Sequence, residues 1–140
     1  MKFDHIGFIV KNGKKVTDFF DAMLGKADWK INDYTFTQDC MIVGNAFVIR
    51  TYNAIIGGDL LEIIEPLEGD DSYFMQCVEN SVGGMHHLAY AFTDNDTCDE
   101  KVEELKAKGY VVIHASERVK GHKTYYLSLP EGSPAIELKV

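Results

Sequence analysis

Residues 4–10 read DHIGFIV, and residues 86–92 read HHLAYAF. In both stretches side chains alternate between two faces with the two-residue period of a half-buried strand. One face carries a histidine, His5 or His87, and then a small residue, glycine or alanine, which leaves room beside the imidazole. The opposite face is bulky and apolar. The chain therefore contains the same strand twice, 82 positions apart, which indicates a duplicated fold.

Each copy of this strand is followed later in the chain by an apolar run that contains one glutamate. These runs are LLEII at residues 60–64 and AIEL at residues 135–138, with Glu62 and Glu137 as their acidic residues. A carboxylate that points inward from an apolar strand is costly unless it is paired or coordinated. A glutamate that points outward remains the alternative for each run taken alone.

The segments between the repeated strands follow one order in both halves. Apolar residues recur at helical spacing before Gly25 and again before Gly109, and glycine is a common helix stop. Asp96 or Thr97 is the expected N-cap of the second helix. Each half thus reads as a strand, a helix and three further strands. The expected strands after the two helices are 35–37, 46–52 and 60–64 in the first half and 110–114, 124–129 and 135–140 in the second.

The predicted fold class is α+β: two βαβββ modules form a cupped, partly closed mixed β-sheet with the helices outside. We expect one domain over residues 1–140, with module 1 at about 1–66, a linker at 67–84 and module 2 at about 85–140. The acidic start of the linker suits a loop, and residues 73–78 suit a short helix.

The composition excludes several classes of protein. The net charge of −8 and a pI near 5.0 argue against a nucleic-acid partner, because phosphate binding needs clustered Lys and Arg. The three cysteines are widely spaced and form no CxxC pair, so neither a disulfide framework nor a thiolate zinc site is indicated. No stretch approaches the length of a membrane span and no secretory signal is evident, so we expect no membrane partner and a cytoplasmic location.

The repeated histidines and glutamates point to one metal site. A lone strand histidine is usually a hydrogen-bonded structural group, but chance does not readily place both residue types at matching positions in both halves. We therefore expect His5, Glu62, His87 and Glu137 to bind one divalent transition metal ion. Mixed nitrogen and oxygen ligands suit Co, Ni, Zn, Mn or Fe better than calcium.

Such a site predicts an enzyme that moves a proton on the carbon next to a metal-bound carbonyl. The ion would stabilise the negative charge that develops on the carbonyl oxygen when the neighbouring C–H proton leaves. A carboxylate must accept that proton, and Glu137 and Glu62 are the candidate catalytic residues. The expected substrate is a small molecule.

The repeated unit resembles the vicinal oxygen chelate (glyoxalase, bleomycin resistance and dioxygenase) superfamily over the whole chain. The run EIIEP at residues 62–66, followed by Ser72, Asn80 and GGMHHL at residues 83–88, looks most like methylmalonyl-CoA epimerases. That resemblance implies an acyl-CoA or another thioester as substrate, and a homodimer. It also makes His87 the ligand and turns the preceding histidine toward the core. Relatives build the site within one chain or across a dimer, and the spacing leaves both open.

The chain departs from the epimerases in ways that keep other functions open. Epimerases use a second acidic base on an inner strand, but residues 46–52 contain no carboxylate and Arg50 stands near that place. Asp33, Asp39 and Asp59 are possible substitutes. Epimerases also often carry glutamine where this chain has Glu62.

Two alternatives follow from these departures. The first is a glyoxalase I (lactoylglutathione lyase) activity, which two glutamate ligands favour, although Ile9 replaces the glutathione-binding arginine of that family. The second is a non-catalytic small-molecule-binding or antibiotic-resistance module.

The substrate-binding candidates are basic residues. Residues 117–123 hold the one local concentration of positive charge, and Arg118, Lys120 and Lys123 could bind the phosphates of coenzyme A at the mouth of the site. Arg50 is the fourth candidate. His114 is expected to be exposed.

Overall fold

The computed structural model describes residues 1–140, except for the side chain of Ser133. Its strands form one mixed sheet in the order β2-β4-β5-β1-β6-β9-β8-β7-β3. The strands are β1 (Lys2–Val10), β2 (Lys30–Phe36), β3 (Met41–Val43), β4 (Phe47–Ile56), β5 (Asp59–Glu68), β6 (Gly83–Ala91), β7 (Val111–Val119), β8 (His122–Leu129) and β9 (Gly132–Lys139). The helices are α1 (Gly13–Leu24), α2 (Tyr73–Glu79) and α3 (Asn95–Ala107), with a 3-10 turn η1 (Gln38–Cys40).

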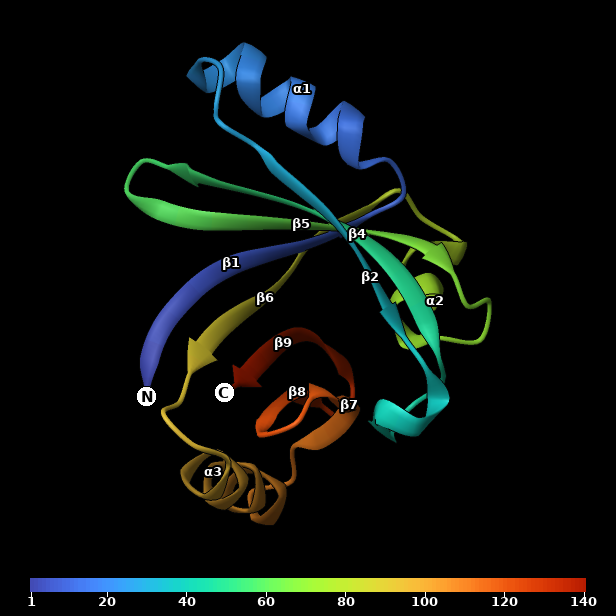
Figure 1. The fold of residues 1–140 in the computed structure, drawn as a ribbon, viewed down its shortest axis with the longest axis vertical. Coiled ribbons are helices and arrows are strands. Elements are labelled where there is room, and N and C mark those ends of the chain that lie inside the picture. The colour runs from blue at the N-terminus through green and yellow to red at the C-terminus, as the bar shows by residue number, and fades with distance from the viewer.

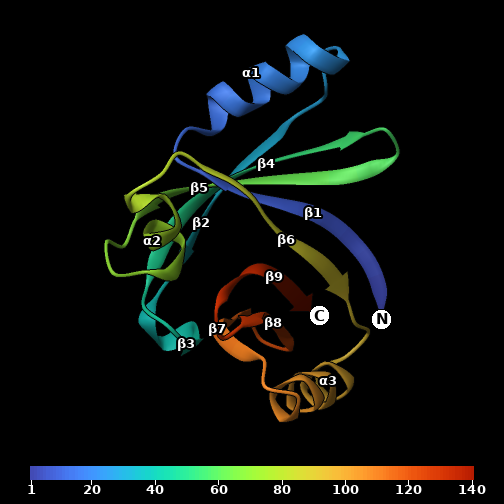
Figure 2. The same cartoon turned by 180° about the vertical axis from the view of Figure 1, so that it is seen from behind.

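The sheet curls into a cup, and α1 and α3 lie on its outside, far from each other (Figure 1). The view from behind shows the same arrangement, with β8 and β9 curled beneath β1 and β6 (Figure 2). The α+β class, the two strand-helix-strand units and the outer helices are confirmed. Among the described residues no helix is both long and apolar enough to cross a membrane.

The two repeated strands lie at the centre of the sheet, paired antiparallel as β1 and β6. Each has its own module's last strand as a parallel neighbour on the other side, β5 beside β1 and β9 beside β6. In the first pair Gly7 lies opposite Glu62, and in the second Ala89 lies opposite Glu137. Each glutamate therefore shares a face with the small residue two positions after the histidine.

The end of α1 and the start of α3 lie close to the residues expected from the sequence. α1 ends at Leu24, and Gly25 follows with a φ of 92°, a positive value that glycine adopts without strain. α3 begins earlier than expected: Asp94 is its N-cap and accepts a hydrogen bond from the backbone N–H of Thr97, in place of the cap expected at Asp96 or Thr97.

The strand β3 was not expected from the sequence. It follows β2 through the turn η1 and pairs antiparallel with β7, so a segment of the first half extends the free edge of the second. Its three apolar residues are too few for a period-two pattern to be recognised. Pairing with β7 covers an edge that would otherwise expose unpaired backbone groups.

The linker helix α2 packs its apolar face into the space between the two modules. Phe74 is 2% exposed, and its ring centre lies 4.8 Å from that of Phe47 on β4 and 5.5 Å from that of Tyr126 on β8. Burial of an aromatic side chain of this size stabilises the fold by roughly 1.5–3 kcal/mol. α2 therefore joins the two halves of the cup rather than merely connecting them.

Candidate metal centre

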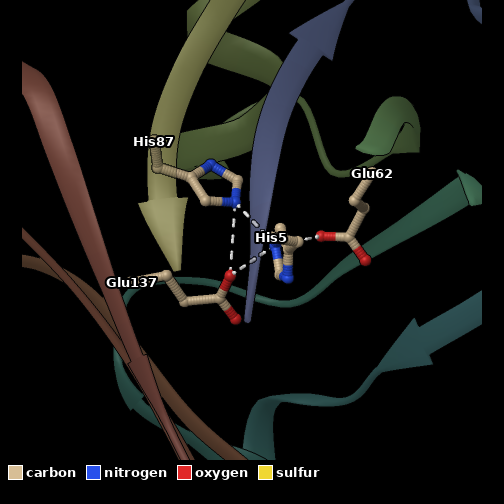
Figure 3. Close-up of side chains that lie close together, drawn as sticks. All are labelled: His5, Glu62, His87 and Glu137. Atoms are coloured by element: carbon tan, nitrogen blue, oxygen red, sulfur yellow. Dashed lines mark hydrogen bonds and ion pairs between the residues drawn. The ribbon is translucent and has the colours of Figure 1, made fainter. Parts of the chain in front are cut away.

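The side chains of His5, Glu62, His87 and Glu137 converge inside the cup, all from one chain (Figure 3). One donor atom from each lies within 4.8 Å of the other three. Nε2 of His5 is 3.2 Å from Nε2 of His87 and 3.2 Å from a carboxylate oxygen of Glu62. Oε2 of Glu137 is 3.1 Å from Nε2 of His5 and 3.2 Å from Nε2 of His87.

These separations fit a shared metal ion. Donor atoms about 2.1 Å from an ion and at right angles around it are about 3 Å apart, close to the separations found here. Oε2 of Glu137 is also buried without a hydrogen-bond partner among the described residues, although two imidazole nitrogens are near it. Such an oxygen has unused acceptor capacity, which a cation can satisfy. The donor set suits a divalent transition metal.

Gly7 provides the space in which the His87 ring sits. A Cβ atom at this position would lie 1.9 Å from Nε2 and 2.0 Å from Cε1 of His87. The two residues are direct neighbours across β1 and β6. The expectation that a small residue leaves room for a second group is confirmed, and the group is the histidine of the other module.

The two glutamates favour the protonated form of His5. Burial lowers the pKa of His5, but the nearby carboxylates of Glu137 and Glu62 outweigh burial and raise that pKa to about 10. For Glu137 burial raises the pKa, and the contacts with His5 and His87 outweigh it and lower the pKa well below its usual range. Because a ligand histidine must be neutral, metal binding has to release the His5 proton.

The residues that precede the two histidines contact the other nitrogen of each ring. Oδ2 of Asp4 lies 2.7 Å from Nδ1 of His5. Nδ1 of His86 lies 3.0 Å from Nδ1 of His87. His86 is half-buried against Tyr73 of α2, and burial lowers its pKa to about 4, so its ring is neutral near pH 7.

A cavity of about 270 Å³ opens beside the cluster and is lined by both modules, including Glu62 and Glu137. His114 lines it too and is 2% exposed, so the expectation that it is exposed is wrong. From His114 onward, alternate residues of β7 face the cavity: His114, then Ser116, then Arg118. The two-residue period of this strand could have placed His114 inside.

The four basic substrate-binding candidates lie in different places. Arg118 lines the cavity at its exposed rim, and its guanidinium lies 4.9 Å from the ring centre of Tyr34. Arg50 is on the other face of β4, where it donates two hydrogen bonds to Asp33. Lys123 pairs with Asp99 of α3 at 2.5 Å, and Lys120 is exposed in the β7–β8 turn.

The three aspartates considered as a second base are not among the described residues that line the cavity. Asp33 is the partner of Arg50 on the outer face of the sheet. Asp39 accepts a hydrogen bond from Thr37 in η1, and Asp59 is exposed at the start of β5. Of the acidic residues, Glu62 and Glu137 are those that the cavity wall contains.

Comparison with known proteins agrees with this architecture. The model of the Glyoxalase/Bleomycin resistance protein/Dioxygenase superfamily matches residues 4–127, and the chain belongs to this superfamily. No curated protein matches the chain.

Solved structures with the same fold include a hypothetical protein from Bacillus halodurans C-125, with 23% identity and a TM-score of 0.63 over 99% of this chain and 92% of that one. Methylmalonyl-CoA epimerase from Mycobacterium tuberculosis has 19% identity and a TM-score of 0.64, over 99% of this chain and 86% of the other. A variant of the Streptomyces coelicolor methylmalonyl-CoA epimerase, in complex with 2-nitronate-propionyl-CoA, has 21% identity and a TM-score of 0.62, over 99% and 96%. At these identities the similarity shows a shared fold.

Proposed function

We propose that this protein is a metal-dependent isomerase or epimerase that moves a proton on the carbon next to a carbonyl group. The observation that carries the proposal is the convergence of His5, His87, Glu62 and Glu137 beside a cavity whose wall contains both glutamates. The superfamily includes enzymes of several classes, so the site rather than the fold supports the reaction.

The two glutamates are suited to proton transfer because they come from opposite modules. A divalent ion held by the four side chains would act as a Lewis acid that makes the carbon next to a substrate carbonyl acidic. Inversion at that carbon needs a proton acceptor on one face and a donor on the other. Glu62 on β5 and Glu137 on β9 supply one carboxylate from each wall. They take the place of the acidic residue that β4 lacks.

The cavity also contains a buried hydroxyl group beside the cluster. Burial, together with the negative charges of Glu137 and Glu62, raises the pKa of Tyr126 well above its ordinary value. Its O–H therefore remains a neutral donor at physiological pH. Apolar side chains such as Phe47 and Phe74 form the neighbouring wall. We propose that they limit water and that Tyr126 helps to orient the substrate.

Arg118 supports an anionic substrate. Lys139 also lines the cavity but is held at 2.9 Å by Asp4. By contrast, the ion pairs found between described residues do not include Arg118, which is held instead over the rings of Tyr34 and Phe36. A positioned guanidinium without a carboxylate partner is suited to a carboxylate or phosphate. An acyl-CoA such as methylmalonyl-CoA carries both groups.

The test is hydrogen exchange at the α carbon. Metal-loaded protein and methylmalonyl-CoA are incubated in heavy water, and deuterium incorporation is followed by mass spectrometry. We expect exchange by the wild type, a large loss for Glu62→Gln and Glu137→Gln, and no loss for Glu68→Gln, which removes the same charge at the exposed end of β5. Absence of exchange at confirmed metal occupancy would rule out the epimerase.

A second candidate is glyoxalase I activity, which one observation favours: the carboxylate of Glu62 lies in the cluster at a position where epimerases often have glutamine. Methylglyoxal with glutathione, followed at the thioester product, tests it directly. A protein that takes up no stoichiometric metal, even after reconstitution, would instead support the non-catalytic binding or resistance module.

A further inference from the structure

The central strands β1 and β6 are each interrupted by a β-bulge next to a histidine of the cluster. Phe3 pairs with Tyr90 and His5 with Ala89, so Asp4 is the extra residue on β1. Gly7 pairs with His87 and Phe8 with Met85, so the extra residue on β6 is His86. A bulge re-aims the side chain of the extra residue. Here it brings that side chain to the same side as the histidine that follows.

The two bulged residues occupy equivalent places in the repeat and make equivalent contacts. Asp4 precedes His5, and its Oδ2 accepts from Nδ1–H of the His5 ring at 2.7 Å. His86 precedes His87, and the two Nδ1 atoms are 3.0 Å apart. In both halves the contact is made by Nδ1. Nε2, the nitrogen that faces the four-residue cluster, is therefore available to bind an ion.

We propose that Asp4 and His86 are positioning residues that fix the ring orientation and tautomer of the two histidines for metal binding. The proposal rests on the metal site of the proposed function. A histidine that binds through Nε2 carries its proton on Nδ1, and an acceptor at Nδ1 holds the ring in that state. Asp4 and His86 are those acceptors, and each depends on its bulge to reach the ring.

The two acceptors are chemically different, which makes the two imidazoles unequal ligands. A carboxylate that accepts from Nδ1–H increases the electron density of the ring more than a neutral imidazole does. His5 is therefore the stronger metal ligand of the two. Asp4 is itself held by Lys139 at 2.9 Å. His86 accepts from His87 through Nδ1, so its own proton is on Nε2, where it meets the hydroxyl of Tyr73. The linker helix α2 thereby supports the ligand of the second module.

Metal affinity of purified variants, measured by competition with a chromophoric chelator for Co²⁺, tests this inference. We expect Asp4→Leu and His86→Phe, which remove the acceptor atoms, to bind Co²⁺ 10- to 100-fold more weakly than wild type, the range for loss of a partner of a ligand histidine. His86→Gln keeps an acceptor oxygen and should restore most of the affinity. Asp33→Asn, which removes the same charge on the outer face of the sheet, should bind like wild type.

The visible absorption of bound Co²⁺ separates positioning from a merely structural role. Altered ligand geometry changes the band positions in Asp4→Leu and His86→Phe, whereas loss of stability alone leaves them unchanged. Wild-type affinity and spectra in both variants would overturn the proposal. His5→Ala distinguishes this failure from failure of the site itself, because it should abolish binding whatever Asp4 and His86 do.

Discussion

The half of the candidate metal centre that module 2 supplies is more deeply buried than the half from module 1. The side chain of Glu137 is 6% exposed and lies close to both histidines, whereas that of Glu62 is 19% exposed and lies close to His5 alone. Burial and shared contacts restrain Glu137, and Glu62 has room to move. From this difference we infer that Glu137 contributes more to holding an ion, and that Glu62 is the one of the two proton-transfer carboxylates that detaches to take a proton.

Exchanging each glutamate for glutamine gives the largest expected effect and tests this difference. Glu137→Gln should weaken metal binding by at least ~100-fold, more than loss of an outer-shell partner does. Glu62→Gln should keep most of the affinity but lower kcat by roughly 10²–10⁴-fold, the usual contribution of a general base. Calorimetric metal titration and kcat at saturating metal measure the two effects separately. Equal losses of affinity in the two variants would contradict the assignment.

The pH dependence of the free energy of unfolding is a second test of the difference between the modules. It concerns His114, in the buried wall of module 2. Burial lowers the pKa of this group to about 4, and the charge of Glu137 opposes only part of that effect. The unfolded chain, with a pKa near 6.5, takes up a proton that the folded protein resists. His114 therefore adds no penalty above about pH 6.5 but destabilises the folded state progressively as pH falls toward 4, by at most about 3 kcal/mol.

Replacement by phenylalanine, which suits the rings of Phe47 and Phe74 beside it, should remove this dependence. Urea unfolding of chelator-treated wild type and His114→Phe between pH 4 and 7 measures the difference. The difference in unfolding free energy should favour the variant increasingly as pH falls. Parallel curves would show that His114 is accessible to protons in the folded state.

The small residues beside the two histidines give a further contrast between the modules. The Cβ atom of Gly7→Ala would overlap the His87 ring, so this variant should lose metal affinity and about 1–3 kcal/mol of stability from overpacking. Ala89→Gly, at the matching place in module 2, removes a buried methyl group and should leave the histidines in place. Thermal unfolding and metal titration of both variants test the pair. Similar metal affinities of the two variants would show that the His87 ring can adopt another position in Gly7→Ala.

The sequence was sufficient to predict those parts of the fold that depend on one strand at a time. The repeat around His5 and His87 predicted the central strands, and the apolar runs around the two glutamates predicted strands that face the cup. A histidine and a glutamate on neighbouring strands meet when they share a face, and alternation is enough to place them there.

Features that depend on a partner strand could not be predicted in the same way. The bulges at Asp4 and His86 exist only in the register of β1 against β6, which neither strand encodes alone. β3 takes its place from β7, a strand about 70 residues later. The β2–β4 pairing likewise places Arg50 opposite Asp33, which draws this arginine into an ion pair outside the cavity.

Substitution of Arg118 and of Arg50 tests whether an anionic substrate binds at the inner wall of module 2. Arg118→Met keeps much of the apolar contact with Tyr34 and Phe36 but removes the charge. It should raise KM for an acyl-CoA about 10-fold with kcat little changed, since a contact to a non-reacting anionic group contributes equally to the ground and transition states. Arg50→Met is the matched control, because its guanidinium is already paired with Asp33 on the outer face. Because screening weakens an exposed charge, the difference between the two KM values should shrink in high salt. A larger rise for Arg50→Met would place the anion outside the cup and leave the cavity with only the reacting end of the substrate.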